Sequence, residues 1–460
     1  MATSPDTDTI CAIATPPGVG GVAIVRVSGP NTRDIAKGSC GRMPAPRTAT
    51  YTRFLTACGA CIDTGIALYF PGPGSFTGED VLELQGHGGP VVSHMLMSRV
   101  MELGARAARP GEFSERAFLN GKLDLAQAEA IADLVSSATE AAARAAQNSL
   151  SGVFSRRINR LQEQLTGIRA FVEAAIDFPD EEIDFLQNSD VLALLEETQA
   201  SVQTLLRQAH QGRLLRDGIV MAIVGRPNAG KSSLLNALSG QDSAIVTGIP
   251  GTTRDVLREW IDLDGLPVHV ADTAGIRETR DPIEMEGVKR AWLALEAADI
   301  VLLVIDVSSE LEHQFALLNE LSRALPGVSH LLIVFNKIDL CTSVHGFEPG
   351  LAEPAKQWRR VSISAKTGEG LDQLKTHIRA SLGAAEQTEG GFSARQRHID
   401  SLNRTLEHLV SGEQRLSRDH AHELLAEELR LAQKSLGEIT GEMVADDLLG
   451  AIFASFCIGK

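Results

Sequence analysis

A glycine-rich stretch that ends in Lys-Ser has the composition of a phosphate-binding loop. Residues 225–232 read Gly-Arg-Pro-Asn-Ala-Gly-Lys-Ser and match the pattern G-x-x-x-x-G-K-[ST]. The apolar run 219–224 before it has strand length, and residues 233–238 after it predict a helix. Glycines let backbone N–H groups turn toward phosphate oxygens, and the helix N-terminus adds a positive dipole end. We therefore expect Lys231 to reach the β- and γ-phosphates of a nucleotide and Ser232 to coordinate Mg²⁺; the alternative is a turn with a chance Lys-Ser.

Four later segments indicate that the nucleotide is GTP rather than ATP. Asn-Lys-Ile-Asp at 336–339 supplies a carboxylate, Asp339, that can accept hydrogen bonds from both N1 and the 2-amino group of guanine, and adenine offers neither donor. Ser-Ala-Lys at 364–366 resembles the last guanine-binding element. Asp-Thr-Ala-Gly at 272–275 resembles the element that senses the γ-phosphate, and 251–255 lies where a switch threonine is needed. These segments follow one another in order at strand ends, where α/β sheets bind ligands.

The residues expected to bind GTP come from all of these segments. Mg²⁺ coordination is expected from Ser232 and Thr253. The full set for the nucleotide is Asn228, Ala229, Gly230, Lys231, Ser232, Ser233, Thr247, Gly248, Ile249, Pro250, Gly251, Thr252, Thr253, Asp272, Thr273, Ala274, Gly275, Asn336, Lys337, Ile338, Asp339, Ser364, Ala365 and Lys366.

Composition limits the class of protein. The 460 residues suggest about three domains, and a hydrophobic content of 43% is enough for packed cores. The sequence contains no run of about eighteen apolar residues, so we expect no membrane span. The N-terminus lacks the basic start of a signal peptide. We expect a cytoplasmic protein, or one of an organelle matrix if a presequence was removed. The net charge of −16 repels a phosphate backbone, so contact with a nucleic acid should be local or beside a more basic partner.

Hydrophobic periodicity predicts a multidomain α/β protein. Residues 1–120 alternate strand-length runs with turns and predict an α+β domain, whereas 121–215 and 383–460 have helical spacing. Residues 216–382 predict a Ras-like P-loop GTPase domain with a doubly wound sheet. Because helical stretches flank it, the economical interpretation is a central helical domain into which the GTPase domain is inserted.

Two residues of the N-terminal domain do not fit a simple strand. Arg26 follows the apolar run 22–25 and precedes Val27, and Glu83 interrupts an apolar strand pattern. An arginine that faces a cleft must find an anion, whereas one that faces outward on an alternating strand needs none. Periodicity alone leaves both alternatives open for Arg26. His87, in a glycine-rich segment, could be catalytic, but a loop histidine without a nearby Asp or Cys is more often structural.

Several segments carry a resemblance to known GTPases. Residues 225–236 and 251–255 resemble the Era-like GTPase superfamily in general. The outer parts of the chain are similar, nearly from end to end, to the MnmE (TrmE) family of bacterial and organellar tRNA-modification GTPases. The segments that carry this similarity are Phe-Thr-Gly-Glu-Asp at 76–80, Gly-His-Gly-Gly at 86–89, Arg-Pro-Gly-Glu-Phe at 109–113 and Phe-Cys-Ile-Gly-Lys at 456–460.

This resemblance implies an activity and its partners. The N-terminal domain would form a homodimer and bind a tetrahydrofolate derivative (the 5-formyl or 5,10-methylene form). Arg26, Glu83, Lys122 and Lys460 match the family's folate-contacting positions. With the FAD-dependent partner MnmG, in a heterotetramer, the protein would add an aminomethyl or carboxymethylaminomethyl group to C5 of the wobble uridine of certain tRNAs.

The resemblance also implies how GTP would be hydrolysed. Ras-like enzymes have a water-orienting glutamine after the Asp-x-x-Gly element, but this chain has Ile276 there. Glu284 matches the glutamate that positions water in the family, and Lys231 would act on the phosphates. A K⁺ ion would be bound by Asn228, Thr247, Ile249 and Thr252 and would neutralise charge in the transition state. From the residues alone, a capping Asn228 and a surface Glu284 are the simpler interpretations.

Two other functions compete with this hypothesis. An Era-like ribosome-assembly switch explains residues 216–382 equally well, but it does not explain Arg26, Glu83 and Lys460. Such factors usually carry a basic RNA-binding domain, which a chain with a net charge of −16 lacks. The second alternative is that the first domain is a stand-alone folate transferase regulated by GTP. Transfer activity without any partner would favour it.

Overall fold

The chain folds into two compact units. The computed structural model describes residues 8–177, 188–239, 244–245, 260–271, 295, 298–308, 331–341, 358–382, 391–419, 421–442 and 446–459. One unit comprises Met1–Ala132, Ser149–Gln203 and Asp400–Lys460, and the other comprises Asp133–Asn148 and Thr204–Ile399. Residues on both sides of the GTPase segment thus belong to the first unit, which agrees with the predicted insertion.

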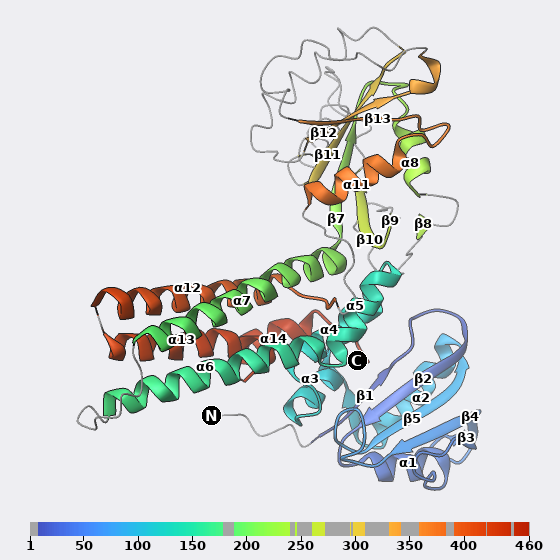
Figure 1. Ribbon diagram of the computed structural model, residues 1–460. Helices are drawn as coiled ribbons and strands as arrows, with labels where there is room; N and C mark the ends of the chain where they lie inside the picture. The colour runs from blue at the N-terminus through green and yellow to red at the C-terminus, as the bar shows by residue number, and fades with distance from the viewer. Residues whose placement is uncertain are drawn as a thin grey trace, which may run out of the picture. The chain divides into compact units, whose positions relative to one another are not determined.

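The N-terminal part of the first unit is an α+β domain built on a six-stranded sheet (Figure 1). The strand order is β3-β4-β5-β2-β1-β6, and all neighbours are antiparallel except β1 and β6. Its elements are β1 (Thr9–Ile13), β2 (Gly20–Ser28), α1 (Thr32–Cys40), β3 (Thr50–Leu55), β4 (Cys61–Phe70), β5 (Val81–Gly88), α2 (Pro90–Glu102), β6 (Ala105–Ala107) and α3 (Glu112–Leu119). Strands β1 and β2 form an antiparallel pair, and their paired residues lie on either side of the glycine-rich residues 16–21.

One face of this sheet carries the apolar core of the domain. Along β2, Val25 and Val27 are fully buried, whereas Arg26 between them is partly exposed, as the two-residue period of a strand requires. Val25 and Val27 pack with Leu82 and Leu84 of β5 and with apolar residues of α1 and α2. Arg26 therefore points to the opposite face from the core.

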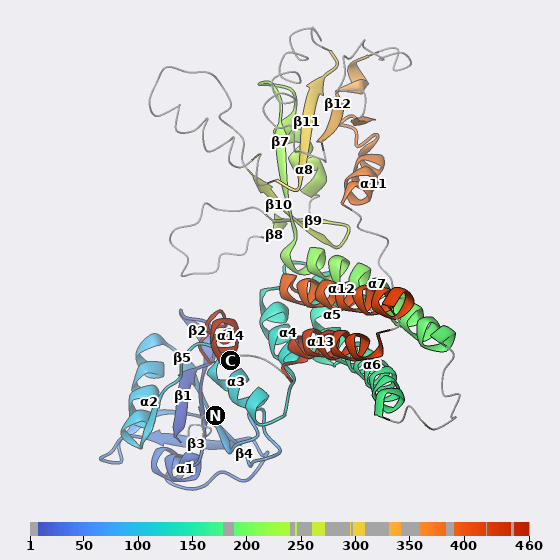
Figure 2. The same cartoon turned by 90° about the vertical axis from the view of Figure 1, so that its left-hand side faces the viewer.

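The rest of the first unit is helical. Figures 1 and 2 show α6, α7, α12 and α13 running side by side. The side chain of Gln199 on α7 donates to Glu413 on α12 at 2.8 Å, and Gln162 on α6 donates to a backbone carbonyl of α13 at 3.0 Å. The described helices that belong to neither the N-terminal α+β domain nor the GTPase fold are α4 (Leu125–Ser136), α5 (Glu140–Leu150), α6 (Val153–Asp177), α7 (Asn188–Asp217), α12 (Gln396–Asp419), α13 (His422–Thr440) and α14 (Asp446–Ala454).

The second unit contains the GTPase fold, a seven-stranded sheet of order β13-β12-β11-β7-β10-β9-β8. Strands β13 to β10 are parallel, and β9 and β8 continue the sheet in antiparallel pairing. The elements are β7 (Ile219–Val224), α8 (Lys231–Ser239), β8 (Ala244–Ile245), β9 (Trp260–Leu263), β10 (Leu266–Ala271), β11 (Ile300–Asp306), β12 (Leu331–Asn336), a 3₁₀ turn (Ile338–Leu340), β13 (Arg359–Ser362) and α11 (Leu371–Ser381). The chain places β10 and β11 on opposite sides of β7, which creates the switch point where such sheets bind ligands.

Short helical segments border the GTPase fold inside the second unit. Asp133, at the end of α4, accepts hydrogen bonds at 2.8 Å from Arg216, just before β7, and from Arg395, just before α12. Both connections to the GTPase fold are thereby joined to one carboxylate. Among the described helices, none has the length and apolar character needed to cross a bilayer.

Candidate functional site

The phosphate-binding loop joins β7 to α8, in the strand–loop–helix context that the sequence predicts. Asn228 has a left-handed backbone (φ 66°), and Gly230 also has a positive φ of 94°. A Cβ atom at Gly230 would lie 2.2 Å from the side-chain nitrogen of Asn336, so only glycine fits there. The Lys231 ammonium donates to the carbonyl oxygens of Gly225 at 2.7 Å and Arg226 at 3.0 Å. Burial lowers the pKa of Lys231.

Asn336 connects the phosphate loop with the two segments that are expected to bind guanine. Its side-chain Nδ2 donates to the carbonyl oxygen of Ala229 at 2.9 Å. Its Oδ1 accepts from the backbone N–H groups of Lys337 at 2.8 Å and Ala365 at 3.0 Å. The residue is only 2% exposed, so each side-chain atom has its partners within the protein. One buried amide thus joins the phosphate loop at Ala229 to Lys337 and to Ala365, although the loop precedes Asn336 by more than a hundred residues.

Asp339 lies beside the last guanine-binding element. Its Oδ1 accepts a hydrogen bond from the Ser364 hydroxyl at 2.7 Å, and the same hydroxyl oxygen accepts from the backbone N–H of Thr367 at 3.1 Å. Asp339 itself remains exposed. A carboxylate held in this way can accept two hydrogen bonds from one edge of a guanine base while Ser364 fixes its orientation.

Asp306 is part of this site, and the sequence analysis missed it. It ends β11 and lies opposite Asn336 in the parallel pairing with β12. Its Oδ2 accepts from the Lys337 ammonium at 2.6 Å, and its Oδ1 accepts from the backbone N–H and the hydroxyl of Ser308. Burial raises the pKa of the Asp306 carboxyl, but hydrogen bonds from Lys337 and Ser308 outweigh burial and hold the pKa below its usual value. An aspartate at the end of the buried run 300–305 was the available signal.

Part of the predicted GTP and metal site lies outside the described residues. This holds for the loop expected to bind K⁺ and Mg²⁺, for the γ-phosphate element and for the candidate catalytic glutamate: Thr247, Gly248, Ile249, Pro250, Gly251, Thr252, Thr253, Asp272, Thr273, Ala274, Gly275 and Glu284. Asn228 and Ser232 are described, and both are exposed at the loop and at the first turn of α8.

Arg26 and Glu83 lie opposite each other in the pairing of β2 with β5. The Arg26 Nε and Nη2 atoms both lie 3.0 Å from Glu83 Oε1, and Nη1 donates to the backbone carbonyl of Gly459 at 3.2 Å. The Arg26 guanidinium also lies 5.9 Å from the ring centre of Phe113. Arg26 therefore has an anionic partner on the sheet face opposite the core, which favours the cleft-facing alternative over the purely outward one.

The other residues expected to contact folate are less informative. The Lys122 ammonium donates to the carbonyl oxygen of Pro73 at 3.0 Å, within the long turn between β4 and β5. Lys460 lies outside the described residues.

His87 does have a carboxylate partner, since its Nδ1 lies 2.8 Å from Asp63 Oδ1, so the premise that it lacks a nearby Asp was wrong. The sequence hid this pair because the two residues lie on different strands.

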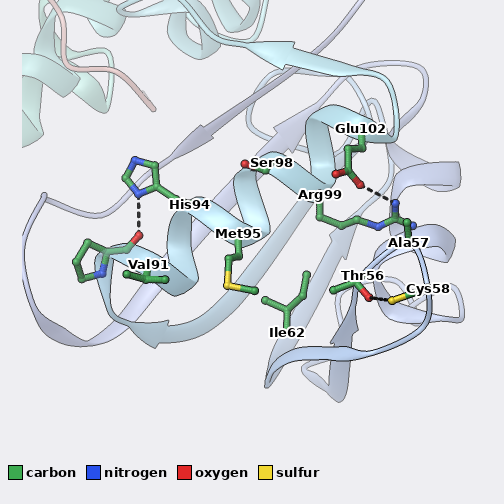
Figure 3. Close-up of a pocket in the computed structure, with 11 residues that line it drawn as sticks. Thr56, Ala57, Cys58, Ile62, Val91, His94, Met95, Ser98, Arg99 and Glu102 are labelled. Carbon is green, nitrogen blue, oxygen red and sulfur yellow. Dashed lines mark hydrogen bonds and ion pairs between the residues drawn. The ribbon is translucent and has the colours of Figure 1, made fainter.

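A cavity of about 700 Å³ lies elsewhere in the N-terminal domain (Figure 3). It lies between α2 and the turn that joins β3 to β4, and its lining is mainly apolar, with Ile62, Val91 and Met95 among the residues. None of the described residues that line it is one that we expect to contact folate. The cavity is therefore distinct from the Arg26–Glu83 pair.

Comparisons with known proteins match almost the whole chain. A family model described as the MnmE helical domain matches residues 125–457, and one described as the GTP-binding protein TrmE N-terminus matches residues 9–122. The tRNA modification GTPase MnmE of Pectobacterium atrosepticum is 54% identical over 457 residues, which are 99% of this chain and 100% of that protein. The protein of the same name from Yersinia pseudotuberculosis is 55% identical over 456 residues, 99% of each chain.

Solved structures provide a weaker comparison. Aquifex aeolicus Era, bound to GDP and aluminium fluoride, is 25% identical over 41% of this chain and 66% of that chain, with a TM-score of 0.27. The family assignment therefore rests on the family models and the curated relatives.

Proposed function

The chain belongs to the MnmE family of tRNA modification GTPases, and on this premise we propose that it modifies C5 of the wobble uridine of certain tRNAs. It would add an aminomethyl or carboxymethylaminomethyl group, with a tetrahydrofolate derivative as donor of the methylene carbon, ammonium or glycine as donor of the nitrogen, and an FAD-dependent MnmG protein as partner. The observation that carries the proposal is that one chain holds both the Asn336 and Asp339 contacts of the expected GTP site and the Arg26–Glu83 pair. We place its action in the cytoplasm, where tRNA is found.

The chain's own residues supply the binding of GTP. Asp339, oriented by Ser364, would accept the two guanine donors, and Asn336 would keep this edge of the pocket in register with the phosphate loop. Lys231 now donates to two loop carbonyls, and it would transfer its N–H donors to the β- and γ-phosphate oxygens. This exchange is local, because the bound phosphates would be cradled by the same loop that supplies these carbonyls.

The described residues fit the metal ions that this chemistry needs. Ser232 offers an exposed hydroxyl in the first turn of α8, where Mg²⁺ meets phosphates in P-loop enzymes, and Thr253 would be a second ligand. Asn228 offers an exposed amide oxygen for K⁺. Thr247, Ile249 and Thr252, outside the described residues, would supply the other ligands. Bound K⁺ would supply positive charge near the phosphates. Glu284 would hold the attacking water, since Ile276 cannot.

The Arg26–Glu83 pair fits a folate. The pair places a guanidinium and a carboxylate next to each other on a sheet face away from the core, with an aromatic ring, Phe113, beside the guanidinium. A folate has a ring with N–H donors and a tail of carboxylates. Glu83 would accept from the ring donors and Arg26 would bind an oxygen of the ligand. Lys122 and Lys460 would add positive charge for the tail.

The test of the proposal uses the full chain as a homodimer with its FAD-dependent partner, GTP, Mg²⁺, K⁺, a tetrahydrofolate derivative, an amine donor (ammonium or glycine) and unmodified tRNA. We expect nucleoside analysis by mass spectrometry to show a modified uridine only when all components are present. A chain that hydrolyses GTP but leaves the wobble uridine unchanged under every combination would contradict the proposal.

Two outcomes would instead favour the alternatives. Binding to ribosomal subunits without any effect on tRNA nucleosides would favour an Era-like assembly switch. One-carbon transfer by this chain without the FAD-dependent partner would favour a GTP-regulated folate transferase.

A further inference from the structure

The contact between Asp306 and Lys337 joins two strand ends at the nucleotide site. Asp306 is only 9% exposed, and its Oδ2 lies 2.6 Å from the Lys337 ammonium. A lysine–carboxylate hydrogen bond at this distance is charge-assisted and strong for its class. The Lys337 side chain is about 30% exposed, so the pair is partly shielded from water.

The carboxylate is a fixed anchor rather than a mobile partner. Its second oxygen, Oδ1, accepts from the Ser308 hydroxyl at 2.6 Å and from the Ser308 backbone N–H at 2.9 Å. The backbone N–H of Val307 donates to the carbonyl oxygen of Asn336 at 3.1 Å, so the chain after Asp306 is also tied to β12. Asp306 thus has little freedom to follow a lysine that moves.

Lys337 is fixed at both ends as a result. Its backbone is left-handed (φ 69°), which non-glycine residues rarely adopt, and its N–H donates to Asn336 Oδ1 at 2.8 Å. Its ammonium is held by Asp306. The aliphatic stem between these two points is therefore restrained before any nucleotide binds, and Asp339 follows two residues later in the chain. A lysine without such an anchor samples many rotamers, and it loses that freedom when a ligand orders it.

We propose that Asp306 is a positioning residue of the guanine site: it holds Lys337 so that the lysine stem forms a preformed apolar wall for the purine base beside Asp339. The proposal rests on the GTP binding of the family and assigns a role to a residue outside the known guanine-binding patterns. Because Asp306 would act on binding rather than on the chemical step, GTP and GDP should be affected equally.

The first experiment is a titration of the full chain with a fluorescent GDP and a matched steady-state assay with GTP. Asp306→Asn keeps the shape of the side chain and removes its charge. We expect the Kd for GDP and the KM for GTP to rise about fivefold, the size expected for ordering one lysine side chain, with kcat unchanged at saturating GTP. Asp299→Asn is the control: it is the same substitution at the other end of the same strand, where Asp299 accepts from the backbone N–H of Val220 at 2.8 Å. It should leave nucleotide affinity unchanged.

A double-mutant cycle separates positioning from a general effect on the fold. In a Lys337→Met background, which keeps the stem but not the ammonium, Asp306→Asn should cause no further loss of GDP affinity. An equal loss in both backgrounds would overturn the proposal, and so would wild-type affinity in Asp306→Asn or a fall in kcat alone. If Asp306→Asn does not fold, Lys337→Met carries the test, and unchanged GDP affinity in that variant would overturn the proposal. Neither result depends on tRNA or folate, so failure here is distinct from failure of the proposed function.

Discussion

The GTP site and the Arg26–Glu83 pair are built in different ways. In the GTP site, the neutral amide of Asn336 and the hydroxyl of Ser364 organise loops at the ends of parallel strands. In the N-terminal domain, an ion pair forms between neighbouring antiparallel strands, and a carbonyl near the chain's end joins it. Parallel strands gather the loops that follow them at one edge, whereas antiparallel strands join single residues by register.

Charge also stabilises the rest of the N-terminal domain. Glu112, at the start of α3, is only 1% exposed, and its Oε1 lies 2.5 Å from Arg106 and 3.2 Å from Arg116. Asp8 accepts from the same two arginines. We therefore expect low pH and charge-neutralising substitutions to have their largest effect on the stability of the N-terminal domain. Substitutions that cause steric conflict should have their largest effect on nucleotide affinity at the GTP site.

The largest effect is expected from Glu112→Gln. Removing the charge of this buried carboxylate leaves Arg106 and Arg116 compensated only in part, by the more exposed Asp8, and should lower the free energy of unfolding by about 3–5 kcal/mol. Thermal or urea unfolding at pH 7 measures this loss. Glu115→Gln is the control on the same helix, where an exposed pair with Arg109 should contribute less than about 1 kcal/mol. Equal effects of the two substitutions would contradict the comparison.

The same carboxylate makes a prediction about pH. Burial raises the pKa of Glu112, but the hydrogen bonds from Arg106, the backbone of Arg109 and Arg116 outweigh it and lower the pKa from 4.5 to about 2. Because the folded pKa lies below the unfolded one, the stabilisation is complete above pH 4.5 and is lost as the pH falls toward 2. The wild-type free energy of unfolding should therefore fall more steeply across this window than that of Glu112→Gln. Parallel curves would show that Glu112 is not the responsible group.

Gly230→Ala should act on the GTP site by steric conflict. The new Cβ would lie 2.2 Å from Asn336 Nδ2 on a backbone with positive φ, so the amide must move away from the phosphate loop. We expect GDP affinity to fall at least about a hundredfold, or about 2.7 kcal/mol. Gly167→Ala, within α6, is the control, because nothing lies within 4 Å of its added Cβ. It should bind GDP normally and be somewhat more stable.

Arg26→Met should separate the two sites. Folate affinity of the full chain, measured by isothermal titration, should fall about tenfold or more, since a charge-assisted contact contributes about 1.5–3 kcal/mol. The KM for GTP should not change. Arg33→Met removes an exposed partner of Asp80 in the same domain and should leave folate binding intact. Loss of GTP binding in Arg26→Met, or unchanged folate binding, would contradict the assignment.

The smallest effect is expected at the border of the GTPase fold. The Thr139 hydroxyl donates to the carbonyl oxygen of Gly265 at 3.0 Å and accepts from the backbone N–H of Ala142 at the start of α5. Thr139→Ala should lower the free energy of unfolding of the second unit by about 1 kcal/mol, as the loss of a helix N-cap does. Thr376→Ala, where the hydroxyl only bonds within α11, should change it by less than about 0.5 kcal/mol.

The segments proposed to bind GTP can be recognised in the sequence because their residues occur in short contiguous patterns. Asp339, Ser364 and Lys231 stand in segments whose spacing carries the chemistry, and the parallel sheet brings those segments together whatever the loop lengths. Asp306 belongs to no such pattern. Aligning the ends of the apolar runs 300–305 and 331–335 would have placed Asp306 opposite Asn336, as in the structure.

The N-terminal site could be predicted only in part. Periodicity left the direction of Arg26 open, because alternation does not say which face of a sheet another segment covers. Its partners Glu83 and Gly459 are 57 and 433 residues away, and strand register brings the first of them close. The resemblance to the family, rather than a local pattern, grouped Arg26 with Glu83 as expected folate-contacting residues.

The most direct test of the account exchanges the nucleotide while tRNA modification is measured. Asp339→Asn loses the carboxylate that we propose accepts from the 2-amino group of guanine, and xanthine, with a carbonyl there, should fit the new amide. In the complete reaction we predict that the Asp339→Asn variant modifies the wobble uridine with xanthosine triphosphate but not with GTP, whereas the wild-type enzyme shows the reverse. Modification that proceeds equally with either nucleotide, or with none, would contradict the claim that nucleotide recognition at Asp339 drives the reaction.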